Sequence, residues 1–173
     1  NPDGFTDLNI RRALSATFTS LQTAFSTENK TSTSTSSAVI VLILQQNLWV
    51  AKLGLSGGVL QNGSKTLSMD LDHWTGFGVS YFSKAHGGVV TITQIPLSSI
   101  NPNSHLLIGT RGIFETVNPE TISRWMATNQ RRFLHESAQD IIYSVLQADK
   151  THKQLSCLII HLNPQENIEH KES

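Results

Sequence analysis

The run Ala38 to Leu44 constrains the fold most, because it is an uninterrupted aliphatic stretch rich in β-branched residues that must be buried. Such a composition favours a strand in a sheet. The run is far shorter than the roughly 20 residues that cross a bilayer, so we expect no membrane anchor. A polar turn at 45–47 and a second apolar stretch, Leu48 to Leu53, follow it. The two stretches predict a β-hairpin.

Further strands and helices are predicted along the rest of the chain. Ile10, Leu14 and Phe18 recur at helical spacing, which predicts an amphipathic helix from Asp7 to Ser26. After the hairpin, the strands at 58–61 and 65–68 should continue an antiparallel meander. The remaining patterns predict strands at 89–95, 105–109 and 155–162, a short helix or packed loop at 74–84, a short helix at 118–126 and a long helix over 133–146. We therefore predict an α+β fold in which helices cover a largely antiparallel sheet.

Length and charge limit the number of domains and the kinds of binding partner that we expect. The sequence has 173 residues, with 13 Lys and Arg balancing 13 Asp and Glu. We expect one domain over residues 1–162 and a polar C-terminal tail over 163–173, in a chain that lacks an initiator Met and is a fragment of a longer protein. The neutral balance argues against nucleic acid and anionic membranes as partners.

One cysteine, Cys157, excludes an internal disulfide and fits a reducing compartment. We expect a soluble, intracellular and cytoplasmic protein. Cys157 lies in the middle of an apolar strand pattern, where a thiol is usually a small core residue and not a nucleophile.

Two local motifs could in principle be a catalytic serine and a metal site. The segment Gly54 to Gly58 matches G-x-S-x-G, which in hydrolases presents a nucleophilic serine between a strand and a helix. Here a strand follows, so we favour a plain β-turn over a nucleophile at Ser56. Asp70, Asp72 and His73 could hold a cation, but alternation along an extended segment places Asp72 and His73 on opposite faces. We predict no catalytic residue, no metal site and no cofactor.

Several segments, taken in order, resemble the metal-dependent protein phosphatase family, the protein phosphatase 2C type. The resemblance implies a β-sandwich flanked by helices, here lacking the family's N-terminal strands and its flap segment. The similar segments are Ser36 to Val41, Leu48 to Leu60, Leu67 to His73, Ala85 to Val90, Leu106 to Glu115 and Ser137 to Leu162.

The departures from the family pattern concern its metal ligands. The resemblance implies that Arg111, Lys153 and Gln154 occupy positions where active members carry ligand residues, two of them carboxylates that hold divalent cations. A guanidinium or ammonium group cannot donate a lone pair to a cation. Leu55 and Gly57 replace the charged residues of the family's Gly-Asp-Ser-Arg turn, whereas Gly54 keeps the glycine of that turn. Gly112 keeps the glycine of the family's Asp-Gly turn.

These departures predict a pseudophosphatase, which is not an enzyme and serves as a regulatory or protein-binding scaffold for an unidentified protein partner. One alternative is an active metal-dependent Ser/Thr protein phosphatase whose ligands come from other segments of a longer protein. A second is an unrelated α+β binding module.

Two further questions stay open at this point. Arg111 and Lys153 either bind a phosphoryl or carboxylate anion together, or each pairs with a carboxylate such as Glu115 or points into water. The aromatic residues Trp74, Phe77, Tyr81 and Phe82 either pack in the core or form a groove for a partner helix.

Overall fold

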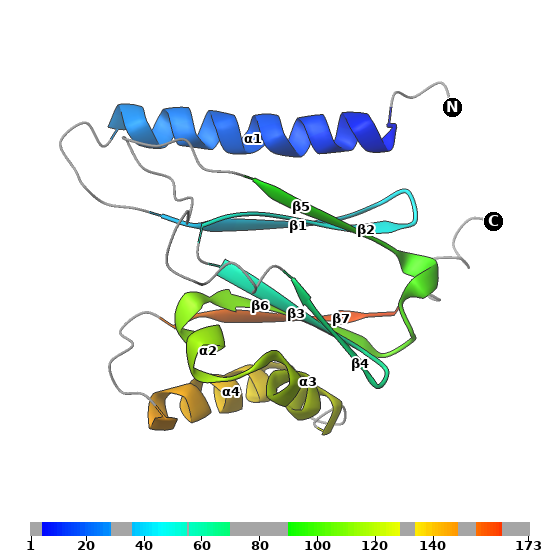
Figure 1. The fold of residues 1–173 in the computed structure, drawn as a ribbon, viewed down its shortest axis with the longest axis vertical. Coiled ribbons are helices and arrows are strands. Elements are labelled where there is room, and N and C mark those ends of the chain that lie inside the picture. Colours follow the sequence, from blue (N-terminus) through cyan, green and yellow to red (C-terminus); the bar gives the residue numbers. More distant parts are fainter. Residues whose placement is uncertain are drawn as a thin grey trace.

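Two β-sheets pack face to face with helices on both outer faces (Figure 1). The computed structural model describes residues 5–28, 36–54, 56–69, 90–128, 134–148 and 155–163. The predicted segment at 74–84, with its aromatic residues, lies outside these ranges. The predicted α+β sandwich flanked by helices is confirmed.

The smaller sheet has three strands in the order β1-β2-β5, and the larger has four in the order β4-β3-β6-β7. All neighbouring strands are antiparallel. The strands are β1 (Ala38–Leu44), β2 (Asn47–Leu53), β3 (Ser56–Asn62), β4 (Lys65–Met69), β5 (Thr91–Pro96), β6 (Ser104–Thr110) and β7 (Cys157–Leu162).

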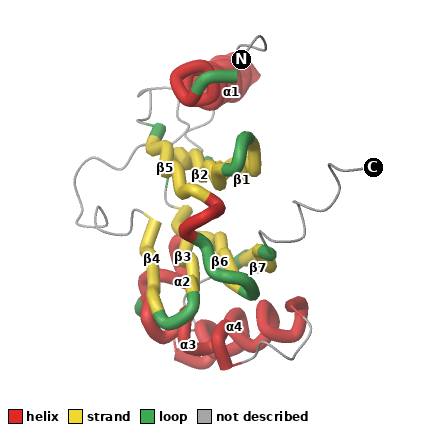
Figure 2. Tube along the Cα trace, turned by 90° about the vertical axis from the view of Figure 1, so that its right-hand side faces the viewer, coloured by secondary structure: helices red, strands yellow, loops and turns green. Residues whose placement is uncertain are grey.

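Helix α1 covers the outer face of the three-stranded sheet, and α2, α3 and α4 lie on the outer face of the four-stranded sheet (Figures 1 and 2). The layers therefore run helix, sheet, sheet, helices. The helices are α1 (Asp7–Glu28), α2 (Arg111–Thr116), α3 (Pro119–Thr128) and α4 (Leu134–Ala148), and a short 3-10 helix, η1 (Leu97–Ser99), follows β5. Among the described residues, no helix combines the length and the apolar character needed to span a membrane.

The predicted hairpin is present as β1 and β2, with Val41 opposite Val50. Its turn is two residues long, because Leu44 already pairs with Asn47. Gln45 and Gln46 have φ values of 51° and 61°. Two positive φ values in succession are characteristic of the type I′ turn, whose twist matches that of paired strands.

The predicted meander is wrong after β2, because β3 does not pair with it. β3 instead joins the other sheet between β4 and β6. The chain crosses between the sheets at Gly54, whose φ is +92°. A Cβ atom at this position would lie 2.5 Å from Cβ of Ser37. Only glycine fits both the backbone conformation and this close approach.

Three apolar layers hold the sandwich together. Phe18 of α1 packs with Trp49 and Leu53 on the outer face of the three-stranded sheet. Leu48, Leu60 and Leu106 belong to the layer between the two sheets. A third layer, on the outer face of the four-stranded sheet, joins β3, β6 and β7 to the helices. It contains Val59, Leu107, Ile113, Ile122, Met126, Ile141, Val145 and Ile159.

Candidate functional site

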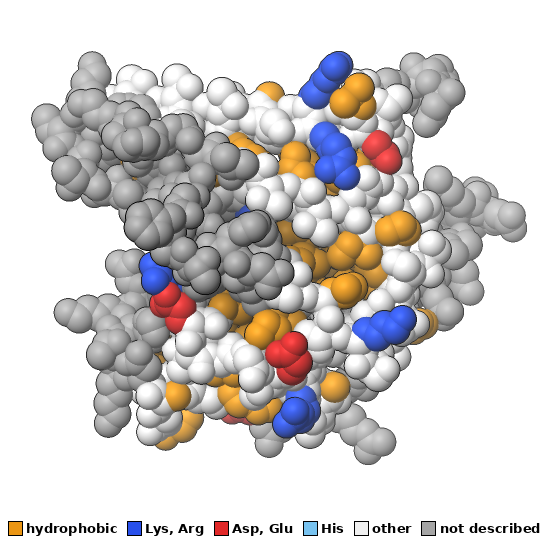
Figure 3. All heavy atoms as spheres, in the orientation of Figure 1, with side chains coloured by type: hydrophobic (Ala, Val, Ile, Leu, Met, Phe, Trp, Pro, Cys, Tyr) orange, Lys and Arg blue, Asp and Glu red, His pale blue; other side chains and the backbone are white. Residues whose placement is uncertain are grey.

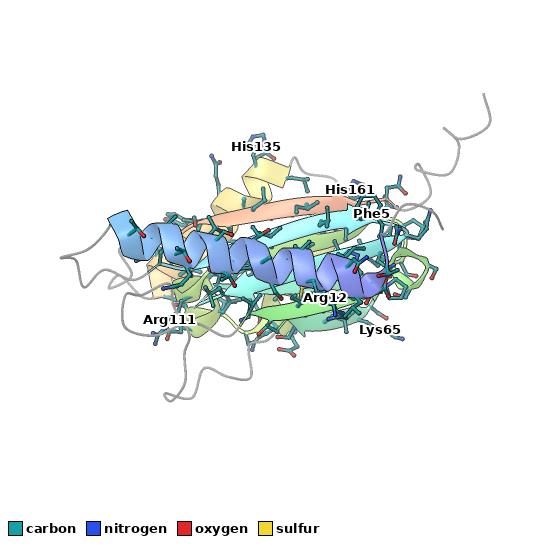
Figure 4. All side chains as sticks on the ribbon, turned by 90° about the horizontal axis from the view of Figure 1, so that it is seen from above. Phe5, Arg12, Lys65, Arg111, His135 and His161 are labelled. Carbon is teal, nitrogen blue, oxygen red and sulfur yellow. The ribbon has the colours of Figure 1, made fainter. Side chains whose placement is uncertain are left out.

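One end of the sandwich collects those positions singled out by the sequence that the structure describes. β3 begins there at Ser56, which lies opposite Thr110, the last residue of β6. α2 begins directly afterwards with Arg111. β7 begins beside them, because Cys157 lies opposite Gly109. Four chain segments thus meet at this end, and Figure 4 shows Arg111 there, at the opposite end from His161.

Arg111 is held by its own helix. Its Nε donates a hydrogen bond to a carboxylate oxygen of Glu115, one turn further along α2, and the two form an ion pair. The Arg111 side chain is 49% exposed. The sequence indicated this pairing as one alternative, because Glu115 is a carboxylate close to Arg111 in the chain. The structure places the two residues four apart on one face of α2. Since an exposed pair of this kind is weak, the guanidinium can exchange Glu115 for another anion at small cost.

Hydroxyl groups and one further cation line the neighbouring strand ends. Ser56 Oγ donates to Ser37 Oγ at 2.8 Å, and Lys52 Nζ donates to the carbonyl of Ser56 at 3.1 Å. Ser56 itself is buried. Its hydroxyl donates to another hydroxyl, which is not a general base, so this arrangement does not support a nucleophilic serine.

Thr110 and Ser156 fasten the end of β6 to the start of β7. The amide of Thr110 donates to the carbonyl of Ser156 at 3.0 Å, and the amide of Ser156 donates to Oγ1 of Thr110 at 3.1 Å. These bonds fix the position of the residue before Arg111 and therefore the start of α2. Sequence patterns did not predict α2, because its six residues, RGIFET, are too few to show an apolar stripe at helical spacing.

The glycines of this end allow close packing. A Cβ atom at Gly109 would lie 2.7 Å from Cδ1 of Ile113, so α2 folds directly back onto β6. Gly57 and Gly112 are buried. Leu55, Lys153 and Gln154 lie outside the described residues, as do Asp70, Asp72 and His73.

The described residues at this end do not fit a site for divalent metal ions. Hard cations such as Mg²⁺ and Mn²⁺ require several oxygen ligands, chiefly carboxylates. Across the described part of the chain, no group of three or more His, Cys, Asp or Glu residues could hold a metal. The side chains that gather here are the guanidinium of Arg111, which is paired with the carboxylate of Glu115, the ammonium of Lys52 and several hydroxyls. Guanidinium, ammonium and hydroxyl groups suit the oxygens of an anion such as a phosphoryl group.

The opposite end of the four-stranded sheet carries a buried polar group that the sequence did not predict. Gln61 Nε2 donates to the carbonyl of Gly63 at 2.8 Å, which leaves Oε1 of Gln61 facing Nδ1 of His105 at 3.1 Å. An amide oxygen only accepts, so Nδ1 of His105 carries the proton. The ring of His105 stacks on that of His161, with centroids 5.0 Å apart. Burial, and then the neighbouring His161, lower the pKa of His105.

The thiol of Cys157 is half-buried, and its Sγ lies 3.7 Å from the carbonyl oxygen of Ala138 in α4. Burial raises the pKa of Cys157. A raised pKa keeps the group a thiol near neutral pH, which does not favour reactivity as a nucleophile.

No protein-family model and no curated protein matches the sequence. The structure, however, is similar to solved bacterial serine/threonine phosphatases. The phosphatase of S. agalactiae is 11% identical with a TM-score of 0.72, and the alignment covers 92% of this chain and 74% of that chain. The phosphatase of Staphylococcus aureus is 12% identical with a TM-score of 0.71, over 91% of this chain and 69% of that chain. The chain has the protein phosphatase 2C fold.

A third similar structure is the catalytic domain of the phosphatase PstP in complex with two manganese ions. It is 13% identical with a TM-score of 0.61, and the alignment covers 82% of this chain and 67% of that chain. At these identities the likeness establishes the phosphatase 2C fold.

The prediction that the chain is not an enzyme is wrong in the light of this comparison. It rested on substituted ligand positions, two of which, Lys153 and Gln154, lie outside the described residues. The structures that share the fold over most of the chain are serine/threonine phosphatases, so an enzymatic function is the better-supported interpretation.

Proposed function

We propose that this chain, with residues 1–162 as one domain and 163–173 as a polar tail, is a phosphatase of the 2C type that hydrolyses phosphate esters of serine or threonine side chains. The observation that carries the proposal is the fold match over 92% of the chain to the S. agalactiae serine/threonine phosphatase. The protein partner expected from the sequence is then its phosphorylated protein substrate.

The metal ligands of this enzyme must come from residues outside the described ranges, because the described residues supply no suitable cluster. This corresponds to the alternative in which other segments of a longer protein provide the carboxylates. The proposal therefore assigns to the described residues the task of binding substrate and not that of holding metal.

Arg111 and Lys153 are the proposed anion-binding residues, and Lys153 lies outside the described residues. The Arg111 guanidinium is half-exposed and weakly held by Glu115. It can turn from Glu115 toward a phosphoryl group and donate two parallel hydrogen bonds to that group. Lys52, half-buried beside Ser56, adds positive charge to the same end of the sandwich.

The test is hydrolysis of a phosphothreonine peptide and of p-nitrophenyl phosphate, with Mn²⁺ or Mg²⁺, by the purified protein in its full natural length, including any segments that flank residues 1–173. We expect metal-dependent turnover that a chelator abolishes. Arg111→Ala should raise KM for the peptide at least about tenfold, because both charge-assisted hydrogen bonds from the guanidinium are lost. Arg124→Ala removes an exposed arginine of α3 and is the matched control. Turnover no faster than in buffer, with either metal and with both substrates, would overturn the proposal.

A further inference from the structure

Three polar side chains form a row across the four-stranded sheet, at the end where β6 begins. Gln61 of β3 lies directly opposite His105 of β6, and His105 lies directly opposite His161 of β7. The residues two positions away on each of these strands pack in the layer under the helices. Because side chains alternate along a strand, the row lies on the same outer face of the sheet.

The two histidines form the closer of the two kinds of cross-strand pair. The amide of Thr110 donates to the carbonyl of Ser156, so this pair at the other end of the two strands is a hydrogen-bonded one. Hydrogen-bonded and non-hydrogen-bonded pairs alternate along an antiparallel ladder, so His105 and His161 form a non-hydrogen-bonded pair. Cα atoms in such a pair are only about 4.5 Å apart, which brings the side chains together.

The hydrogen bonds of Gln61 determine which nitrogen of His105 can bind a ligand. Nε2 of Gln61 donates to the carbonyl of Gly63, so Oε1 of Gln61 accepts the proton on Nδ1 of His105. Nε2 of His105 therefore carries a lone pair. It has no hydrogen-bond partner among the described residues, although His105 is only 5% exposed. A largely buried nitrogen without a partner is the kind of group that a bound ion can satisfy.

The contact between Gln61 and His105 is the supporting arrangement found around metal-binding histidines. Such histidines usually donate their second ring N–H to an oxygen, which fixes the tautomer and the orientation of the ring. The amide oxygen of Gln61 has this role for His105. Imidazole nitrogens suit Zn²⁺, Ni²⁺ and Cu²⁺, whereas Mg²⁺ and Ca²⁺ prefer oxygen ligands.

We propose that Nε2 of His105 and a ring nitrogen of His161 together bind a zinc ion across β6 and β7, with water completing its tetrahedral coordination. The two rings stack with centroids 5.0 Å apart and planes 24° apart, so the His161 ring must turn until its lone pair also points at the ion. His161 is exposed, and no hydrogen bond to a described residue holds its ring. This rotation therefore costs little.

The proposed zinc site is separate from the end that carries Arg111, and it does not depend on phosphatase activity. His105 and Arg111 are six residues apart along extended β6, which corresponds to about 20 Å. Figure 4 also places His161 on the side away from Lys65 and Arg111, which lie toward the face drawn in Figure 3. Two imidazoles are half the ligand set of a structural zinc site, so we expect a dissociation constant of the order of ten micromolar.

The test is calorimetric titration of zinc chloride into the untagged full-length protein, including any segments that flank residues 1–173, in excess Mg²⁺. Mg²⁺ occupies oxygen-rich sites and competes poorly for imidazole nitrogens. His161→Ala should weaken zinc binding at least about tenfold, because one of the two protein ligands is lost. His135→Ala removes another exposed histidine, in α4, and is the matched control. It should bind zinc like the wild-type protein.

Nitrogen NMR of the imidazole rings provides a second measurement that needs no variant. Zinc should shift the Nε2 signal of His105 and a nitrogen signal of His161, while Nδ1 of His105 stays protonated against Gln61. Zinc affinity that is the same in the wild-type protein and in His161→Ala would refute the proposal. Imidazole signals of His105 and His161 that do not change when zinc is added would refute it as well.

Discussion

β1 and β3 have the same length and opposite compositions, and their burial is the reverse of what composition suggests. β1 is entirely apolar, yet none of its residues is fully buried. β3, with the sequence SGGVLQN, is mostly small or polar, yet all seven residues are buried. β3 lies inside its sheet, with α3 on one face and the other sheet on the other face, whereas β1 lies at an edge. Burial in this protein therefore depends on position in the sheet more than on hydrophobicity.

The largest expected effect is the loss of stability when a leucine of β3 or of β1 is shortened. Leu60→Ala in β3 removes a fully buried side chain from the layer between the sheets and should lower the free energy of unfolding by about 3 kcal/mol. Leu42→Ala in half-buried β1 should cost about half as much, because part of that side chain is already hydrated. Urea denaturation measures both losses. Equal losses would contradict the comparison.

A smaller effect is expected at the crossing between the two sheets. Gly54→Ala should destabilise the protein by about 1–3 kcal/mol, because φ is +92° and the new methyl group would collide with Ser37. Gly58→Ala in β3 is the matched control, since its Cβ would meet neighbours at no less than 3.4 Å. Thermal unfolding of the two variants should therefore show a large loss at position 54 and little change at position 58.

The smallest effect concerns the polar end of β3, where Gln61 holds His105. The pKa of His105 is lowered in the folded chain, so the unfolded chain binds more protons between that pKa and the ordinary value of about 6.5. The contribution of His105 to stability should therefore be complete above about pH 6.5, decrease as the pH falls from there toward the lowered pKa, and level off below that pKa.

His105→Phe should flatten this dependence in urea denaturation at a series of pH values. His135→Ala, at an exposed histidine of α4, is the control and should keep the wild-type slope. An unchanged slope in His105→Phe would show that another group is responsible.

Local patterns predicted the hairpin and the long helices well, because their turn residues and apolar spacing lie within a few residues of each other. They missed the crossing at Gly54, since the partner of a strand depends on contacts distant in the sequence: β3 pairs with β6, more than forty residues further on. They also missed the burial of Gln61 and His105, because each is satisfied by a bond to the other that no local pattern reveals.

The candidate site was predicted only in part. The resemblance located Arg111 at a strand end, and the nearby carboxylate of Glu115 suggested one of the two alternatives for its partner. The structure contains this pair. The resemblance could not show whether a substituted ligand position abolishes activity, because metal ligands can come from segments far apart in the chain. The anion-binding roles of Arg111 and Lys153 stay predictions.

The two-residue turn between β1 and β2 has a consequence for the growing chain. Such a hairpin closes within microseconds of leaving the ribosome, whereas β5, which covers the other side of β2, is synthesised about forty residues later. At usual translation rates this leaves a few seconds in which both sides of an apolar hairpin are open. During that interval α1, which is synthesised earlier, is available to pack on one face of the hairpin. The first helix can therefore shield the apolar side chains of that face from other chains until β5 is made.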